Sequence, residues 1–180
     1  MLKWSKAVLF AGSFLLFSCQ QNKTVAEGTS QAKPLKIYEQ NGYKIPSYDF
    51  DNLEYFLNRK DDKVYVVNFW ATWCQPCVEE LPHFESINTS YKHKGVNVIL
   101  VNLDFPKMIE SRLFPFMTEY NIQSEVVILN DPDTNTWIPK VDKNWSGAIP
   151  VTIIYNKDKR IFYEKTFTLD ELKTEVEKFL

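Results

Sequence analysis

The stretch that decides the fold is Val64–Pro82, which reads VYVVNFWATWCQPCVEELP. Its first four residues, Val64–Val67, form an uninterrupted β-branched and aromatic run, which is typical of a strand buried on both faces. After Trp73, two cysteines, Cys74 and Cys77, stand with two residues between them, and apolar residues then recur at helical spacing. The pattern therefore places the first cysteine at the junction of a buried strand and a helix.

Such a junction suits thiol chemistry, because the thiolate is the reactive form of cysteine. The unpaired N–H groups and the positive end of the helix dipole stabilise a thiolate at a helix N-terminus. Cys77 lies within one helical turn of Cys74, which is close enough for the two to form a disulfide. Pro76 falls in the first turn, where its missing N–H loses no hydrogen bond. The spacing favours a redox-active pair of cysteines.

At these residues the chain resembles the thioredoxin superfamily, and most closely its membrane-anchored periplasmic branch, the TlpA-like and cytochrome-c-maturation thioredoxins. The shared pattern is N-F-W-A-T-W-C-x-P-C-x-x-E-x-P, and the chain matches every fixed position from Asn68 to Pro82. The resemblance implies an α/β thioredoxin fold, in which helices flank a central mixed β-sheet. It also implies an enzyme, a thiol–disulfide oxidoreductase that works without a bound cofactor.

The resemblance assigns roles to three residues of the motif. Cys74 is the exposed nucleophile and Cys77 the buried resolving thiol. Glu80 lies one helical turn beyond Cys77, and a carboxylate partly buried there would have a raised pKa and could take the proton of the resolving thiol. In thioredoxin itself this acid is an aspartate on the strand, a site that Asn68 occupies here, and an amide cannot carry the proton. The alternative for Glu80 is a solvated helix glutamate like Glu79 beside it.

The surface that binds a partner protein is expected around the cysteine pair, at Trp73, Gln75 and Pro76. Pro150 stands just before a predicted strand and fits the cis-proline that faces the cysteines in this family. The alternative is a trans proline that begins an edge strand. Ile149, just before it, is expected by the same resemblance to offer its backbone N–H and C=O to an extended segment of the partner.

The rest of the chain predicts strands and helices that complete this fold. Asp51 is the expected N-cap of a short helix, and Gly95 ends the long helix that begins at Cys74. A helix over 104–121, begun or bent by Pro115, precedes a strand over Glu125–Leu129. These two elements resemble the extra helix–strand insertion that the TlpA-like branch carries before the cis-proline. The other expected elements are strands at 37–38, 96–103, 151–155 and 161–165, a helical turn at 137–141 and a final helix over 169–180.

Length and composition indicate one globular domain. A chain of 180 residues can bury a good core, and 44% hydrophobic with 15% aromatic content is typical of a folded protein. The formal net charge is −2, and the sequence has no basic stripe with interleaved aromatic residues. A nucleic-acid partner is therefore not expected.

The first 18 residues differ from the rest: lysines precede the apolar run 7–17, as in a secretory signal. Residues 16–19 read LFSC and resemble the bacterial lipobox, whose cysteine becomes acylated; plain cleavage, with Cys19 incidental, is the alternative. Polar residues then follow to about Lys36, which is typical of a flexible tether. The expected organisation is a lipoprotein signal peptide (1–18), a tether (19–36) and a thioredoxin-like domain (37–180). The domain would be lipid-anchored in the cell envelope and face the periplasm.

A C-x-x-C pair can also be half of a zinc site, which needs two more ligands. The chain offers only His83 and His93, and it has no histidine near the expected cis-proline loop, where a copper carrier would need one, so no metal is expected. Peroxide reduction would need a cysteine shaped to bind peroxide, and no such motif is visible. A non-catalytic thioredoxin-fold binding module or copper carrier is the alternative to the enzyme. The expected partners are protein thiols and disulfides, and the resemblance favours the reducing direction.

We expect Cys19 to carry lipid, because a lipobox-like sequence precedes it and a polar tether follows it. Metabolic labelling with a fatty acid should mark the wild-type protein and leave Cys19→Ala unlabelled. An unlabelled wild-type protein that is released freely from membranes would contradict the lipoprotein assignment.

Overall fold

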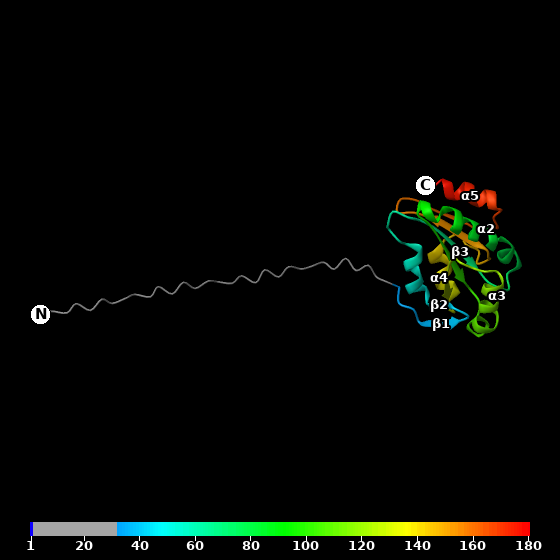
Figure 1. Ribbon diagram of the computed structural model, residues 1–180, viewed down its shortest axis with the longest axis horizontal. Coiled ribbons are helices and arrows are strands. Elements are labelled where there is room, and N and C mark those ends of the chain that lie inside the picture. The colour runs from blue at the N-terminus through cyan, green and yellow to red at the C-terminus, as the bar shows by residue number, and fades with distance from the viewer. Residues whose placement is uncertain (2–31) are drawn as a thin grey trace.

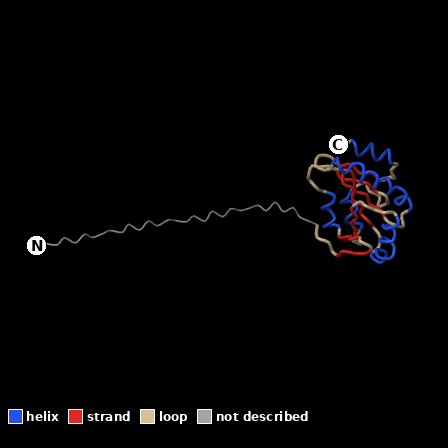
Figure 2. Tube along the Cα trace, viewed as in Figure 1, coloured by secondary structure: helices blue, strands red, loops and turns tan. Residues whose placement is uncertain are grey.

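The computed structural model describes Met1 and residues 32–180 (Figure 1). Cys19, the rest of the predicted signal peptide and most of the predicted tether therefore lie outside the described residues. Helices pack against both faces of a single mixed sheet, so the described part of the chain has a layered α/β architecture (Figure 2). This is the arrangement that the sequence predicts.

The sheet has seven strands in the order β1-β2-β5-β4-β3-β6-β7. Strand β3 pairs in parallel with β4 and antiparallel with β6. The strands are β1 (Lys36–Gln40), β2 (Tyr43–Tyr48), β3 (Val64–Trp70), β4 (Val96–Asn102), β5 (Glu125–Leu129), β6 (Val151–Tyr155) and β7 (Arg160–Tyr163).

Strand β3 is covered on both faces of the sheet, and all seven of its side chains are buried. Alternate side chains enter two separate cores, as the period of a strand requires. Val64, Val66 and Trp70 pack with α2, α3 and α5 on one face. Tyr65, Val67 and Phe69 pack with α1 and α4 on the other. The α-helices are α1 (Phe50–Leu53), α2 (Gln75–Tyr91), α3 (Phe114–Glu119), α4 (Thr134–Val141) and α5 (Leu169–Glu177).

Helix α2 begins one residue after Cys74 and continues through Pro82. The chain then forms a 3₁₀ turn, Lys92–Lys94, and ends it at Gly95, whose φ of 82° lies in the left-handed region that favours glycine. The predicted stop at Gly95 is confirmed.

The N-cap predicted for α1 is wrong by two residues. Asp49, not Asp51, accepts the backbone N–H of Asn52 at 3.0 Å, and its Oδ1 also accepts the Asn52 side chain at 2.8 Å. The helix therefore begins at Phe50, and a 3₁₀ turn, Glu54–Leu57, continues it. Asp51 is exposed and pairs instead with Lys140.

The region predicted as one helix, 104–121, is broken into three pieces. A 3₁₀ turn (Pro106–Met108) leads into a π-helical turn (Ile109–Leu113), and α3 follows. Pro115 lies in the first turn of α3, where its missing N–H is tolerated. Strand β5 follows as predicted.

The sequence prediction missed strand β2. It forms a hairpin with β1 through Asn41 and Gly42, whose φ angles of 53° and 81° are both positive. An Asn-Gly pair between two strand-like runs is a strong hairpin signal, because a type I′ turn needs positive φ at both central positions.

At the C-terminal end, the Ile149–Pro150 bond is cis, as predicted. Helix α4 is longer than the single turn expected, and α5 ends at Glu177, three residues before the predicted end. Thr168 and Glu171 form a capping box that begins α5. Within the described part of the chain, no helix has both the length and the apolar character needed to cross a membrane.

Replacement of the N-cap residue, Asp49→Ala, should lower the free energy of unfolding by about 1 kcal/mol, because the N–H of Asn52 loses its acceptor. Chemical denaturation measures this loss. Asp51→Ala is the matched control and should cost much less, since its exposed ion pair contributes little. A larger loss for Asp51→Ala than for Asp49→Ala would reverse the cap assignment.

Candidate active site

The cysteine pair lies where β3 ends and α2 begins. Cys74 is the N-cap residue of α2, and its Sγ accepts the backbone N–H of Cys77 at 3.3 Å. The two cysteines form a disulfide with their Cα atoms 5.3 Å apart. The chain reaches this position through a tight turn in which the Cys74 N–H donates to the carbonyl oxygen of Ala71 at 3.1 Å. The helix N-terminus therefore supplies an N–H group directly to the first sulfur.

The prediction that Cys74 is exposed is wrong for the disulfide form. Cys77 is fully buried, as expected, but Cys74 is only 6% exposed. Its Sγ lies 3.7 Å from the carbonyl oxygen of Ile149, so the cis-proline loop covers it. Trp73 beside it is 47% exposed, and Gln75 and Pro76 are exposed as well. The expected partner surface therefore surrounds a sulfur that is itself nearly covered.

The cis-proline loop is held by a residue that the sequence analysis did not select. The indole N–H of Trp145 donates to the carbonyl oxygen of Ala148 at 2.7 Å, just before Ile149 and Pro150. Trp145 is buried and packs against Phe69 of β3, with ring centroids 5.2 Å apart. This contact links the loop that faces the cysteines to the strand that precedes them.

Glu80 is 2% exposed, whereas Glu79 is exposed, so Glu80 is not a solvated helix glutamate. Its two carboxylate oxygens accept the backbone N–H of Phe167 at 2.8 Å and the side-chain amide of Asn68 at 3.0 Å. Burial raises the pKa of Glu80 to about 7, although both hydrogen bonds oppose that shift. Such a group can accept or release a proton near neutral pH.

Asn68 does more than replace the strand aspartate of thioredoxin. Its amide nitrogen lies 3.0 Å from Glu80 Oε1 and 3.1 Å from Thr152 Oγ1, so it joins α2 to β6 through the interior. The sequence analysis placed Asn68 and Glu80 in one motif but did not identify Phe167 or Thr152 as their partners. Thr152 stands 84 positions after Asn68, and Phe167 stands 87 positions after Glu80.

In the described part of the chain, neither histidine forms a hydrogen bond with Cys74 or Cys77. His83 Nδ1 lies 2.8 Å from the carbonyl oxygen of Phe167, and His93 lies in the exposed turn after α2. Among residues 32–180, no group of three His, Cys, Asp or Glu side chains converges as a metal site would require.

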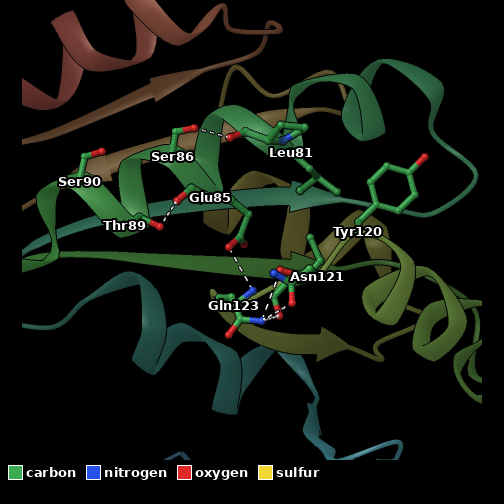
Figure 3. Close-up of a pocket in the computed structure, with 10 residues that line it drawn as sticks. Leu81, Glu85, Ser86, Thr89, Ser90, Tyr120, Asn121 and Gln123 are labelled. Carbon is green, nitrogen blue, oxygen red and sulfur yellow. Dashed lines mark hydrogen bonds between the residues drawn. The ribbon is translucent and has the colours of Figure 1, made fainter.

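A cavity of about 450 Å³ lies along α2, between that helix and the turn after α3 (Figure 3). Glu85 points across it, and its carboxylate accepts the backbone N–H groups of Gln123 at 3.0 Å and Ser124 at 3.1 Å. Neither cysteine lines this cavity. The Glu85 carboxylate therefore fixes this turn to α2, away from the cysteine pair.

Residues 40–164 match the AhpC/TSA family. The thiol-disulfide oxidoreductase ResA of Halalkalibacterium halodurans is 31% identical over 119 residues, which cover 66% of this chain and 62% of that protein. The protein of the same name from Oceanobacillus iheyensis is 30% identical over 129 residues, covering 71% and 62%. The chain thus spans 62% of the length of each of these relatives.

Solved structures confirm the predicted thioredoxin fold. A thiol:disulfide interchange protein of the thioredoxin family from Chlorobium tepidum has a TM-score of 0.56 and 16% identity, covering 83% of this chain and 97% of that one. The thioredoxin domain of a thiol-disulfide oxidoreductase from Bacteroides vulgatus has a TM-score of 0.55 and 21% identity, covering 83% and 95%.

Glu80→Gln should slow disulfide exchange near neutral pH, because it removes the buried base while keeping the side-chain size. General base catalysis is typically worth about 10²–10⁴ in rate. A base must be ionised to act, so the wild-type rate should rise with pH around the pKa of about 7. The variant should remain slow near neutral pH and recover only partly at higher pH, where hydroxide takes over. The measurement is the rate of exchange with a small disulfide across about pH 5–9, a range of two units on either side of that pKa.

Glu79→Gln is the control, since Glu79 is exposed and its carboxylate accepts a hydrogen bond from the neighbouring Gln75 side chain. A second readout is stability. The folded-state pKa of Glu80 is raised above its ordinary value of 4.5, so the wild type should lose stability as pH rises from 4.5 through about 7. Glu80→Gln should not show this loss. Identical rate profiles for wild type and Glu80→Gln would mean that the resolving thiol loses its proton directly to water.

Proposed function

Because this chain belongs to the AhpC/TSA family and holds two cysteines as a disulfide at a helix N-terminus, we propose that it is a thiol–disulfide oxidoreductase. Its substrates would be cysteines of other proteins. The two relatives named as thiol-disulfide oxidoreductases support the proposal. This chain covers only 62% of each of them, so the activity of the whole protein is also part of the proposal.

The observation that carries the proposal is the different setting of the two sulfurs. Cys74 receives an N–H from the start of α2 and borders the exposed Trp73, whereas Cys77 is fully buried one turn along the helix. Disulfide exchange needs a first sulfur that is stabilised as a thiolate beside the partner-binding surface, and a resolving thiol behind it.

In the reducing direction, the thiolate of Cys74 attacks one sulfur of a partner disulfide and forms a mixed disulfide, and the first partner thiolate leaves. The thiol of Cys77 then gives its proton to ionised Glu80, and its sulfur attacks Cys74 Sγ. The second partner thiolate leaves and takes up the proton that Glu80 releases. The first partner thiolate takes up from solvent the equivalent of the proton that Cys74 lost when it ionised. The partner thus gains two electrons and two protons, and the Cys74–Cys77 disulfide forms.

The proposed setting is the cell envelope. The signal-like start of the chain supports export, and the lipobox-like sequence before Cys19 supports a lipid anchor that would keep the domain facing the periplasm. An exported dithiol that reduces proteins there would serve apocytochrome maturation or another extracytoplasmic thiol protein. The exposed residues Trp73, Gln75 and Pro76, with the backbone of Ile149 beside the cis Pro150, are the proposed partner surface.

Cys77→Ser should trap partner proteins, because Cys74 can still attack a partner but the mixed disulfide can no longer be resolved. Complexes isolated from cells without reductant should contain the variant bound to other proteins, and added thiol should release them. Cys74→Ser is the control and should trap none.

A non-catalytic binding module or copper carrier would behave differently. Such a protein would bind its ligand without covalent complexes, and a carrier that uses both sulfurs for copper would lose the metal in either variant. Equal capture by Cys77→Ser and Cys74→Ser, or no thiol-sensitive complexes at all, would contradict the proposed activity.

A further inference from the structure

Thr72, two residues before Cys74, is held on both sides of its peptide backbone. Its N–H and its hydroxyl both donate to Asp104 Oδ1, each at 3.0 Å. Its carbonyl oxygen accepts a guanidinium N–H of Arg112 at 3.1 Å. Every polar group of Thr72 therefore has a partner, and both partners come from the segment that follows β4.

Asp104 is fixed in turn. It is 2% exposed, its Oδ2 accepts the side-chain amide of Asn102 at 3.3 Å, and its own N–H donates to Asn102 Oδ1 at 3.0 Å. The neighbouring Leu103 N–H donates to the carbonyl oxygen of Trp70 at 2.8 Å. In all three of these hydrogen bonds, from Thr72 and Asn102, a carboxylate oxygen of Asp104 is the acceptor, which suits the ionised form. Burial raises the pKa of Asp104, while the contacts with Thr72 and Asn102 and the charge of Arg112 oppose that shift.

Arg112 reaches Thr72 from the π-helical turn Ile109–Leu113. In this turn the N–H of Phe114 donates to the carbonyl oxygen of Ile109, five residues back, and the next residue, Pro115, has no N–H to offer. Single π-turns are rare and cost good helical geometry. Here the π-helical turn carries Arg112, an exposed residue that binds the backbone two residues before Cys74.

We propose that Asp104 and Arg112 are positioning residues for disulfide exchange, which hold Thr72 from opposite sides and so fix Cys74 over Cys77. This inference rests on the proposed function but concerns the cysteine pair itself, not any partner. Neither side chain is proposed to touch the reacting sulfur atoms, and both act through Thr72.

The expected consequence lies in the redox equilibrium. Oxidation of the dithiol by one molecule of glutathione disulfide forms the Cys74–Cys77 bond and releases two glutathione thiols, with two electrons and two protons passing to glutathione. When the loop before Cys74 is held, closing the disulfide orders little additional chain. When the loop is released, the dithiol form gains conformational freedom that must be lost on closure, so the equilibrium shifts toward the dithiol.

The experiment equilibrates the purified protein in glutathione buffers and measures the fraction oxidised by thiol alkylation. Asp104→Ala should shift the equilibrium constant about tenfold toward the dithiol, the scale of losing hydrogen bonds to a charged group. Asp104→Asn keeps one oxygen for Thr72 and should restore most of the wild-type value. Arg112→Gln, an exposed change that should not disturb folding, should shift it in the same direction but less. Glu110→Gln, on the same turn and exposed, is the matched control.

Thr72→Val tests whether Asp104 acts through Thr72, since it removes the hydroxyl donor and keeps the shape. Combined with Asp104→Ala, its effect should be smaller than the sum of the two single effects, because both changes remove the hydrogen bond from the Thr72 hydroxyl to Asp104. A purely structural role would lower Tm in these variants without moving the glutathione equilibrium. That result, additive effects in the double variant, or shifts no larger than that of Glu110→Gln would each overturn the proposal.

The outcome can be separated from the fate of the proposed function. The glutathione equilibrium needs no partner protein, so it reports on Asp104 and Arg112 even if Cys77→Ser captures nothing from cells. Conversely, capture of partner proteins by Cys77→Ser with no shift in the Asp104 and Arg112 variants would support the oxidoreductase and reject the positioning role.

Discussion

Every side chain of β3 is buried, and the strand can be covered on both faces only because helices pack against each side of the sheet. Its parallel pairing with β4 and antiparallel pairing with β6 bring the segment after β4 and the cis-proline loop before β6 to the end of the strand where Cys74 begins α2. The register of these three strands thus decides what surrounds the cysteine pair. A shift of one residue would turn Asn68 toward the opposite core.

The sequence predicts this centre well because its signals are local. The apolar run of β3, the two cysteines and the helical periodicity after them lie within one continuous stretch, so the positions of Cys74 and Cys77 follow without knowledge of the rest of the fold. The errors have equally local causes. Aspartate is a favoured N-cap residue, so the residue type alone does not distinguish Asp49 from Asp51. Only the backbone geometry shows that Asp49 accepts the Asn52 N–H. The Asn41-Gly42 pair is a local signal for the hairpin between β1 and β2, because both residues adopt the positive φ that its turn requires.

Contacts between distant parts of the chain could not be predicted in the same way. Glu80 is bound by the N–H of Phe167, a backbone group that any residue except proline would supply, so no residue type marks it in the sequence. Asp104 follows a strand as many solvent-facing aspartates do, and nothing in its neighbourhood indicates that it accepts two donors from Thr72. Burial of Cys74 in the disulfide form has the same origin, because the covering carbonyl belongs to Ile149.

The two buried carboxylates near the cysteines differ in what opposes their desolvation. Glu80 accepts two hydrogen bonds from neutral groups, and its pKa remains raised to about 7. Burial also raises the pKa of Asp104, but three hydrogen bonds from Thr72 and Asn102 and the positive charge of Arg112 oppose that shift. Glu80, with a pKa of about 7, can exchange a proton near neutral pH, whereas the donors around Asp104 hold its carboxylate against the backbone of Thr72. The fold thus places a carboxylate suited to moving a proton on the helix side of the cysteine pair, and one suited to holding the backbone on the strand side.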